Sequence, residues 1–286
     1  MIAEWAPGLW LAQSRFEQTN AGAFICRGEA CLVDPGVYPD EIAAWERFLH
    51  AQGIRPQALV LTHHHWDHIL GPERFPGVPV VAHAAYLASV GGPEGAPEVE
   101  RRLAEEGIAR VAPFCVPQPD AVFEDTHTLT IGDGGLRLEL LHAPGHAPDQ
   151  LVVYDRQHAT LWSADMLSDR EIPFVSHNLA AYQQTLERLS ALELRRLVPG
   201  HGQPTADPRA IQARLDEDRA YLAELRARVE RAVRAGRSAQ AAVALCGEMR
   251  YRCPAAMAAL HRLNVESAYL ELGGAGDPAA IGWGAI

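Results

Sequence analysis

Metal-binding side chains gather in one short internal stretch of this 286-residue chain, Thr62–His68, which reads THHHWDH. The stretch directly follows the apolar run Ala58–Leu61, and such a run predicts a buried strand. Side chains two residues apart in an extended segment point the same way, so His63 and His65 can reach one ion together. A surface cluster or a purification tag is the alternative. A tag would be terminal, whereas this stretch is internal, and we favour a metal site.

The end of the stretch suits a second ion. Asp67 and His68 are adjacent and are expected to face away from the first pair. A centre with two ions about 3.5–4 Å apart needs three or four protein ligands per ion and a bridging group. The stretch therefore supplies half of such a site.

Three later positions can supply the other half. His146 and His201 each follow an apolar run and a Pro-Gly pair, and Asp165 follows the predicted strand Leu161–Ser163. All three lie at predicted strand ends, where side chains from separate strands can converge on one edge of a sheet. A lone histidine would be a weak signal, but several such positions of the same kind in one chain reinforce one another.

The composition excludes several classes of function. The formal net charge of −11 argues against a protein built mainly to hold a phosphate backbone. All 25 basic residues are arginine, so mechanisms that need a lysine are excluded. The five cysteines form no C-x-x-C pair, and neither a disulfide framework nor a thiolate zinc site is expected. No signal peptide and no apolar stretch of about 18 residues is visible, so we expect a cytoplasmic protein without a membrane span.

The remaining pattern indicates an α/β catalytic domain over residues 1–206 and a helical C-terminal module over 207–286. Residues 84–118 read as a helical insertion that could cover the substrate. Asp207 is a good helix N-cap and Pro208 a good first helical residue. Strands are predicted over residues 9–12, 21–26, 30–34, 58–61, 78–82, 151–154, 160–163 and 197–198, and more than one strand is predicted within 123–141. Helices are predicted over residues 40–51, 179–192, 208–235, 238–246 and 255–272.

The motif order H-x-H-x-D-H, P-G-H, S-x-D and P-G-H-G resembles the metallo-β-lactamase-fold hydrolases, with a core similar to the hydroxyacylglutathione hydrolases. The preceding run Leu32–Gly36 is similar to that superfamily's first motif. The resemblance covers roughly residues 8–205. It implies an αββα sandwich of mixed α and β structure in four layers, with metal ions at one edge of its two sheets.

The resemblance also implies roles for single residues. His63, His65 and His146 would hold the first ion, and Asp67, His68 and His201 the second, with Asp165 bridging them. Asp34 would hydrogen-bond the ligand loops, and His142 is a candidate hydrogen-bond donor behind the ligands. His64 occupies a variable motif position and is expected to face away from the ions.

We expect two divalent ions, with zinc favoured and manganese or iron as alternatives. A hydroxide bridging the ions would attack the substrate, and Asp67 is the expected catalytic residue that orients it or carries its proton. The substrate is expected to be a small ester, thioester or lactone in an apolar pocket near Trp66, Tyr86, Met166, Phe174 and His177.

Two other functions stay open. One is a single-strand endoribonuclease of the same fold, because residues 207–262 carry 11 Arg against 7 Asp plus Glu. We favour a solvated helix face with i,i+4 pairs such as Glu224–Arg228 and Glu230–Arg234. The other is a slow-turnover ligand-binding regulatory protein. A homodimer is an open possibility, and a nucleic-acid partner is disfavoured.

Overall fold

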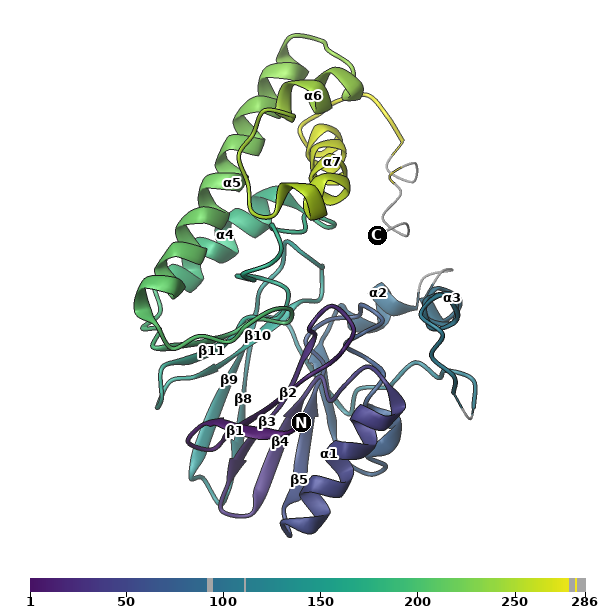
Figure 1. The fold of residues 1–286 in the computed structure, drawn as a ribbon, viewed down its shortest axis with the longest axis vertical. Coiled ribbons are helices and arrows are strands. Elements are labelled where there is room, and N and C mark those ends of the chain that lie inside the picture. The colour runs from purple at the N-terminus through teal and green to yellow at the C-terminus, as the bar shows by residue number, and fades with distance from the viewer. Residues whose placement is uncertain (92–94, 111, 278–280, 282–286) are drawn as a thin grey trace.

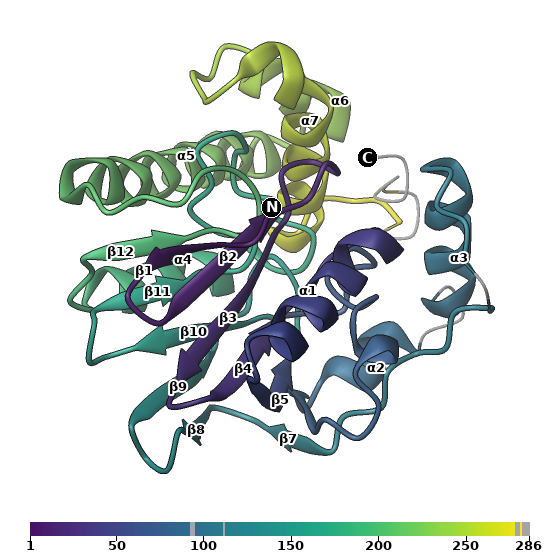
Figure 2. The ribbon, with the colours of Figure 1, turned by 60° about the horizontal axis from the view of Figure 1, so that its bottom comes forward.

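The computed structural model describes residues 1–91, 95–110, 112–277 and 281. Two β-sheets lie face to face, and helices cover the outer side of each (Figures 1 and 2). The predicted αββα sandwich is therefore confirmed, and the long C-terminal helix lies against the outer layer of the second sheet.

The first sheet has an antiparallel N-terminal half and a parallel second half, in the order β1-β2-β3-β4-β5-β6-β7. Short turns join the antiparallel strands, whereas helices connect the parallel ones. The sequence did not indicate the edge strand β1, which has only four residues. The strands are β1 (Ala3–Ala6), β2 (Leu9–Gln13), β3 (Asn20–Cys26), β4 (Glu29–Val33), β5 (Arg55–Val60), β6 (Val80–His83) and β7 (Ala121–Phe123).

The second sheet has the order β12-β11-β10-β9-β8, and β12 joins it parallel to β11. A turn at residues 132–135 joins β8 to β9. Its strands are β8 (Thr126–Ile131), β9 (Leu136–His142), β10 (Leu151–Asp155), β11 (Thr160–Trp162) and β12 (Arg196–Val198).

The helices divide between the two outer faces (Figure 2). On the side of the first sheet lie α1 (Pro39–Ala51), the 3₁₀ turn η1 (Pro72–Arg74), α2 (Tyr86–Val90) and α3 (Gly95–Glu105). On the side of the second sheet lie α4 (Leu179–Ser190), α5 (Pro208–Arg234), α6 (Ala239–Cys246) and α7 (Pro254–Glu271).

Three apolar clusters fill the interfaces between these layers. Phe24, Val60 and Trp162 belong to the cluster between the sheets and are at most 1% exposed. A side chain on Gly22 would come within 2.4 Å of the Trp162 ring, so this strand position needs glycine. A second cluster lies under α1, and the third joins the second sheet to α4–α7.

The C-terminal module shares its core with the catalytic domain. Leu222 and Val229 of α5 belong to the same cluster as Leu161 of the second sheet. The predicted boundary at residue 207 coincides with the start of α5, where the Asp207 side chain accepts a hydrogen bond from Arg209 N at 2.9 Å. The module therefore adds an outer layer to the sandwich.

The arginine-rich surface of α5 carries the expected i,i+4 ion pairs. Arg228 lies 2.7 Å from Glu224 and Arg234 lies 3.4 Å from Glu230.

Within the ranges the structure describes, no helix has both the length and the apolar character to cross a bilayer.

Candidate metal centre and its cavity

The candidate ligands come from segments that follow four strands and meet at one edge of the sandwich. The stretch Thr62–His68 follows β5, His146 follows β9, Asp165 follows β11 and His201 follows β12. Parallel pairing of β4 with β5 and of β11 with β12 brings these ends to the same edge. The structure brings together all seven residues expected as ligands.

The first group comprises His63, His65, His146 and Asp165, whose ligand atoms all lie within 4.8 Å of one another. Nε2 of His146 is 2.9 Å from Nδ1 of His65 and 3.3 Å from Nε2 of His63. Three ring nitrogens therefore converge on one point, which is the arrangement that holds a metal ion.

The second group comprises Asp67, His68 and His201, also within 4.8 Å of one another. Oδ2 of Asp67 lies 3.3 Å from Nε2 of His201 and 3.4 Å from Nε2 of His68. The Thr19 hydroxyl, which donates to the Phe16 carbonyl at 2.9 Å, lies 3.5 Å from the same oxygen.

Asp165 reaches both groups. One carboxylate oxygen lies 3.4 Å from Nε2 of His63 and of His201. The other lies 3.3 Å from Nε2 of His68. Despite this short distance, neither atom makes a hydrogen bond of acceptable geometry, and both are buried. Buried polar atoms without partners are costly, so the donor set fits a bound cation.

The protonation states favour metal binding by the first group. Burial lowers the pKa of His146 to about 3 and holds that of His65 well below its usual range. Both rings are therefore neutral near pH 7, and the neutral imidazole is the form that binds metal. Burial alone would raise the pKa of Asp165, but the positive charges of His68 and His201, whose own pKa values are raised well above the usual range, keep it well below its usual range.

Asp34 supports the stretch from beneath. Its buried carboxylate accepts hydrogen bonds from the Thr62 backbone N–H at 2.9 Å and from the Thr62 hydroxyl at 2.6 Å. It also lies 3.0 Å from Nδ1 of His68. With Nδ1 donating to this carboxylate, Nε2 of His68 is left for a ligand.

Two nearby histidines have other partners. His64 pairs through Nδ1 with the buried Asp149 at 2.7 Å and belongs to neither ligand group. His142, expected as a hydrogen-bond donor behind the ligands, instead donates through Nε2 to the Pro148 carbonyl at 2.9 Å and stacks on His83. Among the described residues, the hydrogen bond of His142 is therefore made to the loop that follows His146 and not to a ligand side chain.

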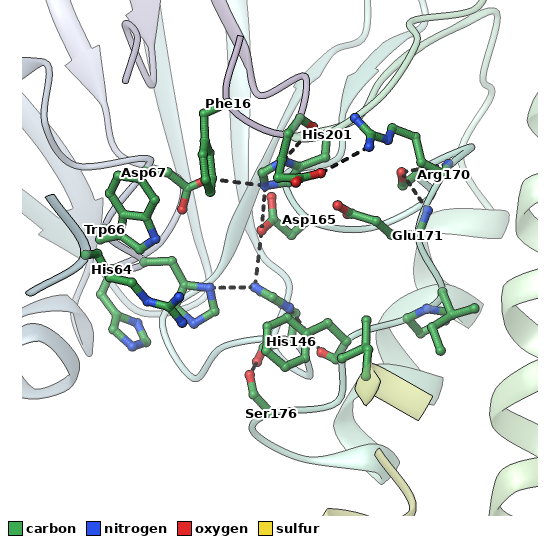
Figure 3. Close-up of a pocket in the computed structure, with 18 of the residues that line it drawn as sticks. Phe16, His64, Trp66, Asp67, His146, Asp165, Arg170, Glu171, Ser176 and His201 are labelled. Atoms are coloured by element: carbon green, nitrogen blue, oxygen red, sulfur yellow. Dashed lines mark hydrogen bonds and ion pairs between the residues drawn. The ribbon is translucent and has the colours of Figure 1, made fainter. Parts of the chain in front are cut away.

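A cavity of about 910 Å³ opens over the two groups (Figure 3). Trp66 and Phe174 line it, as expected from the sequence. Its far walls come from the insertion and from the C-terminal module. α3 contributes Val99, and α7 contributes Met257 and Leu260. The edge of the sandwich that carries the candidate ligands therefore faces a largely apolar cavity.

A family model described as the metallo-beta-lactamase superfamily matches residues 15–201, more than half of the chain. The chain belongs to the metallo-beta-lactamase superfamily. It is a hydrolase of that superfamily with a His/Asp metal-binding cluster, and divalent metal ions are implied.

Named relatives agree with this assignment. The acyl-coenzyme A thioesterase MBLAC2 of Gallus gallus is 26% identical over 216 residues, covering 67% of this chain and 76% of the relative. A metallo-beta-lactamase family protein of Thermus thermophilus, TTHA1429, superposes with a TM-score of 0.67 at 24% identity, covering 94% and 93% of the two chains.

The helical module of this superfamily member also has a structural counterpart. The stereoselective inverting sec-alkylsulfatase Pisa1 of Pseudomonas sp. superposes with a TM-score of 0.77 at 17% identity. The match covers 98% of this chain, so it includes α5–α7, but the chain spans only about half (51%) of the sulfatase chain.

Three residues expected in the pocket of this superfamily member lie elsewhere. Tyr86 is fully buried in the core under the first sheet's helices, because α2 turns Ser89 and Val90 to the cavity instead. Met166 is buried in the cluster that includes residues of α4 and α5. His177 is exposed and is absent from the cavity lining.

Other lining residues escaped the sequence analysis. Phe16, in the turn between β2 and β3, packs edge-on against Trp66 with ring centroids 4.7 Å apart. Glu171 and Arg170 follow Asp165 on an irregular loop (Figure 3). Burial raises the pKa of Glu171. No motif marks these positions, since they depend on loops that meet only in the folded chain.

A buried ion pair between α5 and the segment before α7 predicts a pH-dependent stability for this superfamily member. Burial raises the pKa of Asp218 to about 7, although Arg252, 3.3 Å away, lowers it. Between about pH 4, the unfolded value, and pH 7, the folded protein holds a proton that the unfolded chain releases. Stability should therefore fall as the pH rises through this window, by at most about 4 kcal/mol at 1.36 kcal/mol per pKa unit.

The variant Asp218→Asn should lose this part of the pH dependence. We expect urea denaturation between pH 5 and pH 8 to show a smaller loss of stability in the variant than in the unmodified protein. The exposed Asp216 on the same helix gives the control Asp216→Asn, which should keep the original slope. Parallel slopes in Asp218→Asn and the unmodified protein would contradict the prediction.

Proposed function

We propose that this protein hydrolyses thioesters that carry an apolar acyl group, with two metal ions held by the two ligand groups. The observation that carries the proposal is the position of these groups at the floor of an apolar-walled cavity of about 910 Å³. The acyl-coenzyme A thioesterase activity in the name of the MBLAC2 relative supports a thioester over the ester and lactone alternatives.

In this proposal the chain's residues have separate tasks. His63, His65 and His146 hold one ion, Asp67, His68 and His201 hold the other, and Asp165 contacts both. Divalent ions held there would supply a hydroxide nucleophile at neutral pH. Zinc suits this set of nitrogen and carboxylate ligands.

Asp67 is proposed to orient the nucleophile as well as to hold the second ion. Its carboxylate is 6% exposed and lines the cavity, so it lies between the ligand groups and the substrate space. The imidazoles of His68 and His201 outweigh the effect of burial and hold its pKa well below the usual range. The carboxylate is therefore ionised at neutral pH and can accept a hydrogen bond from the attacking nucleophile, which orients it.

The charges around the cavity disfavour the ribonuclease alternative. Apart from the candidate ligands, its described lining contains the carboxylates of Glu17, Glu98, Glu106, Glu171 and Asp218 and the guanidiniums of Arg102 and Arg170. Both arginines pair with lining carboxylates, Arg102 with Glu98 at 3.2 Å and Arg170 with Glu17 at 3.0 Å. A surface with an excess of carboxylates repels a polyphosphate backbone.

A series of acyl thioesters of increasing chain length tests the proposal. Each methylene buried against the apolar walls contributes about 0.8 kcal/mol, so kcat/KM should rise about fourfold per added methylene until the cavity is full. Alkyl sulfate esters of the same chain lengths form the comparison series. Faster turnover of the sulfates, or no dependence on chain length, would refute the thioester proposal.

A charge on the α7 wall should weaken this dependence. Met257→Glu places a carboxylate against the acyl chain, and the lost apolar contact should lower kcat/KM for long thioesters about tenfold. Short thioesters should be much less affected. The matched control is Leu87→Glu, because Leu87 is already 42% exposed and lies outside the cavity lining. Equal losses in both variants would contradict the placement of the acyl chain.

A further inference from the structure

The ring of His146 is oriented by a backbone carbonyl. Its Nδ1 donates a hydrogen bond to the Phe174 carbonyl at 3.0 Å, which leaves Nε2 directed at the first ligand group. Phe174 lies in the irregular segment that follows Asp165 and ends before α4. No strand or helix ladder holds this segment, so its position depends on other contacts.

A single side chain of α7 holds the peptides on both sides of Phe174. Asn264 donates through Nδ2 to the Pro173 carbonyl at 2.6 Å and accepts through Oδ1 from the Val175 N–H at 2.8 Å. The side chain is fully buried. Buried hydrogen bonds of this kind fix geometry, because breaking one leaves an unsatisfied group in the core.

Asn264 is itself fixed by a chain of buried hydrogen bonds within the C-terminal module. Its Nδ2 also donates to the Tyr221 hydroxyl of α5 at 2.9 Å. That hydroxyl donates to Nδ1 of His261 at 2.9 Å, and Nε2 of His261 donates to the Cys246 carbonyl at 3.1 Å. When each group donates to the next in this order, every donor and acceptor of this hydrogen-bond network has a partner.

The beginning of the same segment is also held by the module. Arg214 of α5 donates to the Leu167 carbonyl at 3.3 Å. Arg252 donates to the carbonyls of Ser168 and Glu171, the latter at 2.6 Å. Both ends of the segment between Asp165 and α4 are therefore attached to α5–α7.

We propose that Asn264 is a positioning residue for the metal centre, acting on His146 through the backbone of Phe174. The C-terminal module thereby sets the affinity of the His63, His65 and His146 group for its ion. This inference rests on the proposed function only in taking His146 as a metal ligand.

The test compares Asn264→Leu with Val265→Ala. Leucine has a similar volume but leaves the Pro173 carbonyl and the Val175 N–H unpaired. Val265 is the next residue of α7 and is fully buried in the same core, but its apolar side chain cannot hydrogen-bond the two peptides, so its truncation controls for destabilisation of the helix. Metal retention is measured against a competing chelator, and the absorption spectrum of the cobalt-loaded protein reports the ligand geometry.

We expect Asn264→Leu to bind one of two zinc ions about tenfold more weakly, as seen when partners of ligating histidines are removed. The cobalt spectrum should change, whereas Val265→Ala should keep the original affinity and spectrum. Equal metal retention in the two variants would overturn this inference but not the proposed function. Failure of the unmodified protein to bind zinc would instead overturn the proposed function.

Hydrogen exchange on the unmodified protein provides a measurement that needs no variant. Coupling between binding and positioning is reciprocal, so zinc should slow exchange at Val175 and in the parts of α5 and α7 around Tyr221 and Asn264. Slower exchange confined to the ligand loops, with α5 and α7 unchanged, would overturn the inference even if Asn264→Leu did not fold.

Discussion

Replacing Asp165 with alanine is expected to abolish thioester hydrolysis and to remove at least one bound metal ion. The carboxylate lies within 3.4 Å of His63 and His201 and within 3.3 Å of His68, so its loss disrupts both ligand groups at once. Even residues that only support metal ligands contribute 10- to 100-fold, so kcat/KM should fall by at least about 10²-fold. Steady-state kinetics and metal analysis of the purified protein measure the two effects.

Two further variants make this result specific. Asp165→Asn keeps the size of the side chain but removes its charge, and it should lose metal almost as strongly. The exposed Asp133, in the turn between β8 and β9, provides the control Asp133→Ala, which should behave as the unmodified protein. Near-normal turnover by Asp165→Ala would show that this carboxylate does not belong to the reactive centre.

Replacing Gly145 with alanine should have the largest effect on stability. Gly145 has φ +137°, and an added Cβ would lie 2.3 Å from the Tyr182 Cα and 2.6 Å from its backbone nitrogen. These atoms belong to α4 and cannot move as a flexible side chain would. Backbone strain and overpacking together should cost about 3 kcal/mol or more, and denaturant unfolding measures this loss.

The matched control is Gly134→Ala in the turn between β8 and β9. Gly134 also has a positive φ, +80°, but a Cβ there would meet nothing within 4 Å. Its cost should stay near that of placing an L-residue in the left-handed region, about 1–2 kcal/mol. Because Gly145 directly precedes His146, its variant should also weaken metal binding, and the control should not. Equal losses of stability in both variants would show that contact with α4 is unimportant.

The four layers were predicted through the resemblance to the metallo-β-lactamase-fold hydrolases, whereas the convergence of the ligand segments could be predicted from the residues themselves. Apolar runs marked the strands, and the Pro-Gly pairs before His146 and His201 marked the points where chain direction is fixed. Geometric convergence follows from strand ends meeting at one sheet edge, so local signals were sufficient there. The edge strand Ala3–Ala6 escaped because four residues show too little periodicity.

The cavity was predictable only in outline. The insertion and the C-terminal helices do wall it, but which face of each helix turns inward depends on packing between distant elements. Tyr86, in the predicted insertion, and Met166, directly after Asp165, were expected to line it. Both instead fill apolar cores, Tyr86 beneath α1 and Met166 against α4 and α5.

The support provided by Asn264 left no trace in the local sequence. It lies 89 residues from Val175 and 91 from Pro173, and an isolated asparagine on a helix has no recognisable pattern. Only the folded structure brings the helix and the segment together. Long-range polar contacts of this type therefore mark the limit of motif-based inference.

In the proposed function, chemistry and selectivity are carried by different parts of this chain. The groups that can hold metal ions end at His201, whereas part of the wall that a substrate would meet is built by α7, beyond residue 253. Substitutions at wall positions such as Met257 and Leu260 can therefore reshape the substrate range while every ligand stays unchanged. The superfamily's reaction could in this way be inherited intact while a descendant acquires a new substrate.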